Sequence, residues 1–446
     1  MLFKQFVDDD LGCASYLIGC EAAGQAVVVD PAYFVEPYLE EAARREVRIV
    51  RTVETHNHAD HVSGHGRLAL EHGVPVSVHP LCDPQFAFDP LEDGQEITCG
   101  NVTLRVIHTP GHRPEHCCLA VTDRTRADEP WLVLTGDSLF VGEAARPDLA
   151  VEAREGAEGL FHSLHRLLEL GDGVEVYPGH VAGSLCGKAM SSKASTTIGF
   201  ERRFNPALAL ATVEEFVVES ASVSAPRPPN IERIVELNRG PFVGRPELLQ
   251  PLASAEGVAV LDVRPVEAYA AGHVPGALNV PITGSSFATK AGFVLPAGTP
   301  IALHGDSADE IERAARGLHS IGFLELAGYL ADPPATETMQ PVEVDELERL
   351  LADGDICLID VRELDERDSG YIAGSRHIPY RLLRVAADDL PRDQTIVTIC
   401  ESGARAAVGA SVLAAAGLDV RPVVHGGIGD WEANGHRTIE FRRCGS

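Results

Sequence analysis

The chain has 446 residues, and its 37 Lys and Arg against 66 Asp and Glu give a formal net charge of −29. This length exceeds what one hydrophobic core usually serves, so we expect roughly two to four domains. The excess of negative charge repels a phosphate backbone, which argues against nucleic acid as a partner.

We expect no signal peptide and no membrane span in this chain. Asp8, Asp9 and Asp10 precede any apolar run, and no stretch approaches the roughly 18 uninterrupted apolar residues of a span. The ten cysteines are irregularly spaced and include no C-x-x-C pair, unlike a disulfide framework. The sequence therefore predicts a soluble cytoplasmic protein with free thiols and no membrane partner.

Short apolar runs with few helical segments between them fill residues 1–240. These runs are SYLIGC, AVVVD, VRIVRTVET, VPVSVH, VTLRVIHT, WLVLTGD and VEVYPGH. Their length and β-branched content predict strands, and several of them end at His or Asp. We therefore expect functional side chains on loops at one edge of a sheet-rich domain.

Seven His and Asp side chains in this region have the spacing of a metal site. Four of them follow one strand in the motif THNHADH, and the other three each follow a glycine at a strand end. The seven are His56, His58, Asp60, His61, His112, Asp137 and His180. Imidazole and carboxylate are ligands that zinc and iron accept. A solvated histidine-rich surface would not explain three separate glycine-flanked strand ends.

This set resembles the metallo-β-lactamase superfamily, whose H-x-H-x-D-H motif and three later ligands are present in order. The resemblance implies an αββα sandwich over residues 1–240 with a metal site at its open edge. Two branches stay open on ligand types alone. Binuclear hydrolases such as hydroxyacylglutathione hydrolase use all seven side chains, whereas persulfide dioxygenases bind one Fe(II).

The surrounding sequence resembles the bacterial persulfide dioxygenases. The segments that carry this resemblance are MLFKQF, THNHADHVSGH, TPGHRPEH, GDSLFVG and PRPPNIERIVELNRG. It implies one Fe(II) per chain with open positions for O₂ and substrate, and the implied ligands are His56, His112 and Asp137. The implied role of the other four is to orient ligands and water, and these are His58, Asp60, His61 and His180.

Three further side chains are expected to bind substrate. The resemblance implies that Arg146 binds the thiol carrier, with an ordinary surface ion pair as the alternative. Cys186 and Lys188 follow His180 closely, so we expect them near the mouth of the site. Cys186 could accept or hold a persulfide there, and a passive buried thiol is the alternative.

Residues 261–281 and 359–379 resemble each other without a gap. The two segments, LDVRPVEAYAAGHVPGALNVP and IDVRELDERDSGYIAGSRHIP, share the Asp-Val-Arg triplet, two glycines and the final proline, which indicates a duplication. Each copy alternates strands and helices, so we expect an α/β domain with a parallel sheet. The proposed domains are residues 241–337 and 338–446.

Cys400 ends the apolar strand TIVTI and begins the loop CESGAR, which leads into a helix-forming run. Backbone N–H groups and the positive helix end converge on such a position and favour a thiolate nucleophile, with a structural cysteine as the alternative. With DVR from Asp360 and HGGIGDW from His425, this loop resembles the rhodanese sulfurtransferases. The resemblance implies that Cys400 carries sulfane sulfur as a persulfide and that Arg405 is the catalytic cation.

The first copy aligns Gly305 with Cys400 and Glu310 with Arg405. It therefore lacks both the nucleophile and the cation. We expect a rhodanese fold without catalysis that acts as a spacer or docking surface, and binding of a ligand by the loop HGDSADE stays open.

Together the resemblances imply a persulfide dioxygenase followed by an inactive and an active rhodanese domain. A low-molecular-weight thiol persulfide would react with O₂ to give sulfite and the thiol, and Cys400 would pass sulfane sulfur to sulfite to give thiosulfate. One rival is a binuclear zinc thioester hydrolase with Asp60, His61 and His180 as direct ligands, and another is a non-enzymatic sulfur relay or scaffold. The sequence leaves open whether the carrier is glutathione, coenzyme A or another thiol, and whether the chain forms a homo-oligomer.

Overall fold

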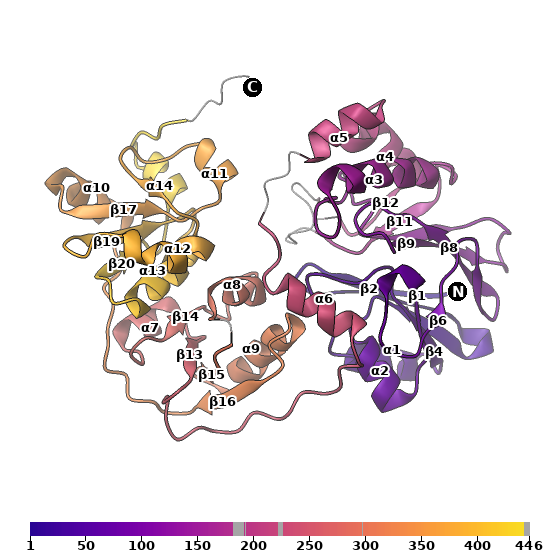
Figure 1. Cartoon of the computed structure of the whole chain (residues 1–446), viewed down its shortest axis with the longest axis horizontal. Helices are drawn as coiled ribbons and strands as arrows, with labels where there is room; N and C mark the ends of the chain where they lie inside the picture. The colour runs from indigo at the N-terminus through magenta and orange to yellow at the C-terminus, as the bar shows by residue number, and fades with distance from the viewer. Residues whose placement is uncertain (182–190, 192, 222–225, 297, 441–446) are drawn as a thin grey trace. The chain divides into compact units, whose positions relative to one another are not determined.

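The computed structural model describes residues 1–181, 191, 193–221, 226–296 and 298–440 (Figure 1). The chain divides into two compact units, the first of which consists of Met1–Pro246 with His319–Gly322. The second consists of Glu247–Leu318 and Phe323–Ser446. Among the described helices, none combines the length and the apolar character that a membrane crossing requires. The domain boundaries near 240 and 338 stay predictions.

The first unit contains two six-stranded sheets. In the first sheet, β1, β2 and β3 pair antiparallel, and the pairs from β3 to β6 are parallel. Its strands are β1 (Leu2–Val7), β2 (Ala14–Cys20), β3 (Gln25–Val29), β4 (Arg48–Val53), β5 (Val76–Val78) and β6 (Asp89–Pro90). The second sheet runs in the order β12-β11-β10-β9-β8-β7. Its strands are β7 (Glu96–Cys99), β8 (Val102–His108), β9 (Cys117–Asp123), β10 (Leu132–Gly136), β11 (Glu175–Pro178) and β12 (Thr196–Thr197).

Helices lie on both outer faces of this pair of sheets (Figure 1). Helices α1 (Glu36–Arg44) and α2 (His65–His72) pack on the first sheet. The second sheet is covered by α3 (Ala153–Leu167), α4 (Ile198–Phe204) and α5 (Val213–Ala221), and α6 (Ile231–Arg239) follows them in the chain. The apolar side chains of α3 recur every three or four residues, as on a one-sided helix. Side chains from both sheets form a common core between them, so the expected αββα sandwich is confirmed.

The second unit contains two four-stranded sheets of equivalent order, β14-β13-β15-β16 and β18-β17-β19-β20. Every strand pair in them is parallel, as predicted for the duplicated segments. The first copy contains β13 (Ala259–Asp262), α7 (Val266–Ala271), β14 (Leu278–Asn279), α8 (Phe287–Val294), β15 (Ile301–His304), α9 (Ala308–Ser320) and β16 (Leu326–Leu330). The second contains α10 (Val344–Asp353), β17 (Ile356–Asp360), α11 (Leu364–Asp368), β18 (Arg376–His377), α12 (Leu383–Ala386), β19 (Thr395–Ile399), α13 (Ala404–Ala415), β20 (Val420–Pro422) and α14 (Ile428–Ala433).

The strand register gives the same alignment of the two copies as the sequence repeat. Asp262 pairs with His304 in the first sheet, and Asp360 pairs with Ile399 in the second. The residues that follow His304 and Ile399 therefore occupy equivalent positions in the two copies. Gly305 stands where the second copy has Cys400.

Candidate functional site

His56, His112 and Asp137 lie together at the ends of β4, β8 and β10. One donor atom from each lies within 4.8 Å of the others, and all three side chains are buried. Asp137 Oδ2 is 3.6 Å from His112 Nε2 and 4.0 Å from His56 Nε2. The fold therefore brings together the three residues that the sequence proposed as metal ligands.

Hydrogen bonds fix the tautomers of both histidines. Thr55 Oγ1 donates to Asp30 Oδ2 at 2.8 Å, so His56 Nδ1 must be the donor in its 2.9 Å bond to the same hydroxyl. His112 Nδ1 donates to the carbonyl oxygen of Arg146 at 3.0 Å, because a carbonyl can only accept. Both Nε2 atoms therefore keep a lone pair, the form that binds a metal ion.

The donor set fits a divalent metal ion. His56 Nε2 and Asp137 Oδ2 are buried without a hydrogen-bond partner in the described part of the chain, although buried polar atoms are normally paired. Burial, with the neighbouring His58 and His112, holds the pKa of His56 well below its usual value. A neutral imidazole pair facing one carboxylate suits zinc or iron.

The residue before Asp137, Gly136, has a backbone conformation and surroundings that require glycine. Its φ is +45°, and a Cβ there would lie 2.7 Å from both His116 Nε2 and Thr55 Oγ1. His116 Nε2 in turn accepts the backbone N–H of Asp137 at 2.9 Å. Burial and the neighbouring His112 lower the pKa of His116 to about 3, so this acceptor stays neutral. Sequence reasoning missed His116, whose only signal was its place in the histidine-rich segment.

Asp60, His61 and His180 form a second group beside the first. His180 donates from Nδ1 to Asp137 Oδ1 at 2.8 Å and from Nε2 to Asp60 Oδ2 at 2.6 Å. His61 Nδ1 lies 3.3 Å from Asp60 Oδ1. Burial alone would raise the pKa of Asp137, but His180 outweighs it and lowers that pKa to about 2. This group therefore holds one oxygen of Asp137 and leaves the other facing the histidine pair.

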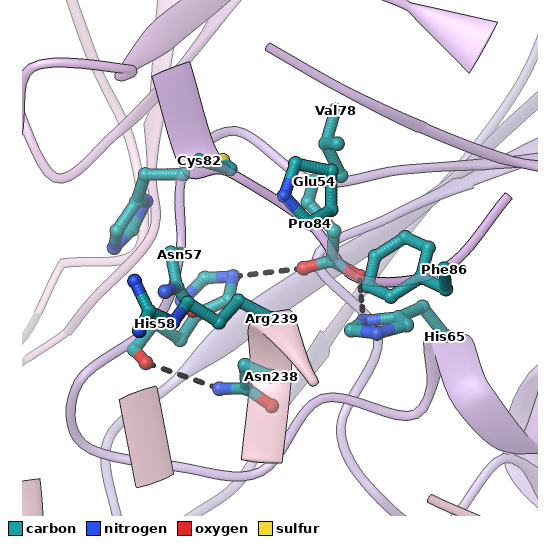
Figure 2. Close-up of a pocket in the computed structure, with 11 residues that line it drawn as sticks. Glu54, Asn57, His58, His65, Val78, Cys82, Pro84, Phe86, Asn238 and Arg239 are labelled. Carbon is teal, nitrogen blue, oxygen red and sulfur yellow. Dashed lines mark hydrogen bonds and ion pairs between the residues drawn. The ribbon is translucent and has the colours of Figure 1, made fainter. Parts of the chain in front are cut away.

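His58 belongs to a third group, shown in Figure 2, with Glu54 and His65. His58 Nε2 is 3.2 Å from Glu54 Oε2 and 3.3 Å from Asp30 Oδ1, and His65 Nδ1 is 3.2 Å from Glu54 Oε1. Burial opposes charge on His58, but Asp30 and Glu54 outweigh it and raise its pKa well above the usual value. The His58 ring lies directly beside that of His56, with the ring centroids 4.2 Å apart, and Asp30 and Thr55 link the two through hydrogen bonds. Sequence reasoning missed both carboxylates.

Helix α6 fixes the backbone of the THNHADH loop. Asn238 Nδ2 donates to the carbonyl oxygen of His58 at 3.0 Å (Figure 2). It also donates to the carbonyl oxygen of His61, at 2.8 Å. Its Oδ1 accepts the backbone N–H of Ser63 at 2.8 Å. The loop therefore keeps its shape through a residue far along the chain.

Arg146 lies buried beside the ligand loop. Its Nε and Nη2 each donate to Asp148 at 2.7 Å, and its Nη1 donates to the carbonyl oxygen of Pro226 at 2.9 Å. The structure thus places its guanidinium in an ion pair and its carbonyl on His112. Cys186 and Lys188, the other expected substrate contacts, lie outside the described residues.

Cys400 lies at the turn between β19 and α13, where its Sγ accepts the backbone N–H of Ala406 at 3.4 Å. Both terminal nitrogens of Arg405 donate to Glu366 on α11 at 2.6 Å. The HGG loop packs directly on this turn, since a Cβ on Gly427 would lie 2.2 Å from the carbonyl oxygen of Cys400. Both predicted residues therefore belong to one loop, and no sequence pattern indicated Glu366.

The equivalent loop of the first copy is filled by its own carboxylate. Glu310 Oε2 accepts the backbone N–H of Asp306 at 2.7 Å and lies 3.2 Å from where a Cβ on Gly305 would stand. An acidic side chain thus takes a backbone N–H that a bound anion could otherwise use.

Comparisons with known proteins agree with the division into a sandwich domain and two duplicated α/β copies. Residues 8–180 match the metallo-beta-lactamase superfamily, and residues 245–331 and 343–434 match the rhodanese-like domain. An uncharacterized protein of Mycobacterium leprae is 32% identical over 237 residues, covering 47% of this chain and 99% of that protein. The mitochondrial persulfide dioxygenase ETHE1 of Bos taurus is 29% identical over 249 residues, covering 53% of this chain and 87% of that protein. The crystal structure of a metallo-beta-lactamase from Staphylococcus aureus has a TM-score of 0.69 and 30% identity, and the match covers 75% of this chain and 99% of that one.

Proposed function

From the premise that this chain belongs to the metallo-beta-lactamase superfamily and carries two rhodanese-like domains, we propose an Fe(II)-dependent persulfide dioxygenase joined to a sulfurtransferase. The similarity to a persulfide dioxygenase and the rhodanese-like domains make it an enzyme of sulfur metabolism. The observation that carries the proposal is the convergence of His56, His112 and Asp137, in which His56 Nε2 and Asp137 Oδ2 are buried without a partner among the described residues.

These three residues would hold one Fe(II) per chain. When bound there, Fe(II) supplies open coordination positions at which persulfide sulfur and O₂ can react. Thr55 and the carbonyl of Arg146 hold both histidines in the ligand tautomer, and His180 fixes Asp137. The overall reaction is RSSH + O₂ + H₂O → RSH + SO₃²⁻ + 2H⁺, in which the terminal sulfur loses four electrons to O₂.

Cys400 would carry out the second reaction. Sulfite sulfur attacks the outer sulfur of a persulfide on Cys400, the bond from that sulfur to Sγ breaks, and thiosulfate leaves with the electron pair returned to the Cys400 thiolate. Arg405 closes the CESGAR loop and would supply the positive charge, and Glu366 fixes its orientation. The sulfite made at one site is thereby the acceptor at the other.

We propose Arg146, Cys186 and Lys188 for binding the carrier thiol. The Arg146 guanidinium would have to exchange its pairing with Asp148 for a carrier carboxylate. The Arg146→Ala variant keeps the carbonyl that holds His112, so it should raise KM for persulfide and leave the metal content unchanged.

We also propose that the enzyme acts in the cytoplasm, with a small-molecule persulfide, O₂ and sulfite as its partners. The described cysteines are all free thiols, which suits a reducing compartment.

The test combines elemental analysis with oxygen uptake on a panel of persulfides, with sulfite and thiosulfate quantified together. The wild type should contain iron and release mainly thiosulfate when persulfide is in excess. The His112→Ala variant should lose metal and oxygen uptake, yet make thiosulfate when sulfite is supplied. The matched Cys400→Ser variant should consume oxygen and release sulfite.

A zinc thioester hydrolase is the second candidate, because Asp60, His61 and His180 also converge. Two zinc ions per active chain, with turnover unaffected by removing oxygen, would replace the dioxygenase proposal with this one. Metal-free protein with an unreactive Cys400 would instead indicate a scaffold.

A further inference from the structure

Cys13 lies against the second group of the metal site, although its sequence context gave no reason to place it there. It directly precedes β2 and forms a β-bridge with His180. The N–H of the next residue, Ala14, donates to the carbonyl oxygen of Gly179 at 2.7 Å, so the backbone places Cys13 beside His180. Its Sγ lies 3.3 Å from Asp60 Oδ2, 3.5 Å from His61 Nδ1 and 3.4 Å from His180 Nε2. The thiol is buried, so one sulfur atom contacts three groups that could each bind a metal ion.

The two groups of possible metal ligands differ in how many of their polar atoms already have hydrogen-bond partners. In the first, His56 Nε2 and Asp137 Oδ2 have no partner among the described residues. In the second, both Asp60 oxygens are engaged, Oδ1 with His61 and Oδ2 with His180 and Cys13. Within the described part of the chain, His61 Nε2 is the one buried atom of this group that lacks a partner. The buried atoms of the first group therefore lack a partner that a metal ion would supply, whereas most polar atoms of the second group are already paired.

The Cys13 thiol is part of this arrangement. Its Sγ donates to Asp60 Oδ2 at 3.3 Å and lies within 3.5 Å of His61 Nδ1 and His180 Nε2. The sulfur atom therefore lies where an ion bound by these three side chains would have to fit.

We propose that Cys13 determines how many metal ions the chain holds, because its thiol fills the second donor group and restricts binding to the first. The inference rests on the proposed metal-dependent function and adds a residue that sets the number of ions. Removing the thiol should leave Asp60, His61 and His180 facing an open space in which a second ion fits.

The test is reconstitution of the metal-free full-length protein with Co²⁺, read without substrate by elemental analysis and by the thiolate-to-cobalt absorption band. Wild type should bind about one Co²⁺ and show no such band, whereas Cys13→Ala should bind about two. Cys13→Ser keeps a donor for Asp60 and should bind one. Cys20→Ala, which removes a buried thiol from the far end of β2, is the matched control and should also bind one.

Three results would overturn the proposal. Two ions in the wild type with a thiolate band that Cys13→Ala removes would make Cys13 a ligand, and two ions without that band would mean that the thiol excludes nothing. One ion in Cys13→Ala, with near-UV circular dichroism like that of the wild type, would show that the thiol does not set the number. A protein that binds one Co²⁺ as predicted but never consumes oxygen with iron would refute the proposed function and leave this inference standing.

Discussion

In both rhodanese-like copies the first strand of the sheet ends in an Asp-Val-Arg triplet whose arginine turns back onto the aspartate. Arg264 Nη2 lies 2.6 Å from Asp262 Oδ2, and Arg362 Nη2 lies 2.9 Å from Asp360 Oδ2. Each arginine also donates to the carbonyl oxygen of the equivalent glycine, Gly272 or Gly370. The duplication has therefore kept the contacts that hold the fold.

The loops that follow β15 in the first copy and β19 in the second have diverged. Where the second copy has Cys400 and Arg405, the first has Gly305 and Glu310, and the Glu310 carboxylate bonds to its own loop. The shared fold therefore does not depend on these loop residues, whereas we expect the chemistry to depend on them. This expectation can be tested by changing the loops while the Asp-Arg pairs stay intact.

The largest effect is expected from Cys400→Ser. Removing the nucleophile should lower sulfurtransferase activity by roughly a thousandfold or more. Mass tagging after persulfide treatment should label Cys400 in the wild type and nothing in the first-copy loop. Cys357→Ala, which removes a buried thiol from β17, is the control and should retain activity. Full activity in Cys400→Ser would assign the chemistry elsewhere.

Arg405→Ala should have the next largest effect. A hydrogen bond to a charged group contributes about 1.5–3 kcal/mol, so we expect a roughly 10- to 100-fold loss of kcat/KM for sulfite. Glu310→Ala, at the equivalent position of the first copy, should change nothing. Equal losses in the two variants, measured by thiosulfate formation, would mean that both loops take part.

Exchanging the loop residues should transfer part of the reactivity. In a Cys400→Ser background, Gly305→Cys with Glu310→Arg should give a thiol that persulfide labels, roughly tenfold more slowly than Cys400 because the pocket is tight. An added Cβ at Gly305 would lie 3.1 Å from Val263 Cγ2 and 3.2 Å from Glu310 Oε2, and the second contact disappears in the double variant. Gly305→Cys alone should be labelled less, since Glu310 disfavours a thiolate. Mass spectrometry of the labelled loop decides this.

The smallest effect concerns pH. Burial would raise the pKa of Glu366, but its pairing with Arg405 outweighs burial and lowers that pKa. A lowered carboxyl pKa stabilises the fold above its unfolded value of 4.5 and loses this contribution as the pH falls through the folded pKa. Glu366→Gln should therefore lower Tm at neutral pH, corresponding to a loss of about 1 kcal/mol or less in the free energy of unfolding. The difference should shrink as the pH falls below 4.5 and vanish below the folded pKa. The first copy has Ala268 there, so Ala268→Gln is the matched control and should show no such pH dependence.

The sequence predicted the features that are local along the chain. Strands with β-branched runs, and the parallel sheets of the duplicated copies, follow from short patterns, and the structure has them. The residues that were missed act across long separations. Cys13 meets Asp60 and His180 at separations of 47 and 167 residues, and Glu366 meets Arg405 at 39. No periodicity links such pairs, because the tertiary fold alone brings them together.

Helix α13 of the second copy depends on the first copy for part of its burial. Ala406–Leu413 are all buried, and the Ser411 hydroxyl accepts the backbone N–H of Asn279 in the first copy at 2.9 Å. Helix α9 instead keeps charged residues on its outer face. A helix without a polar face must be covered on every side. The first copy can therefore lack the cysteine, but a chain without this copy would expose apolar side chains of α13 to solvent.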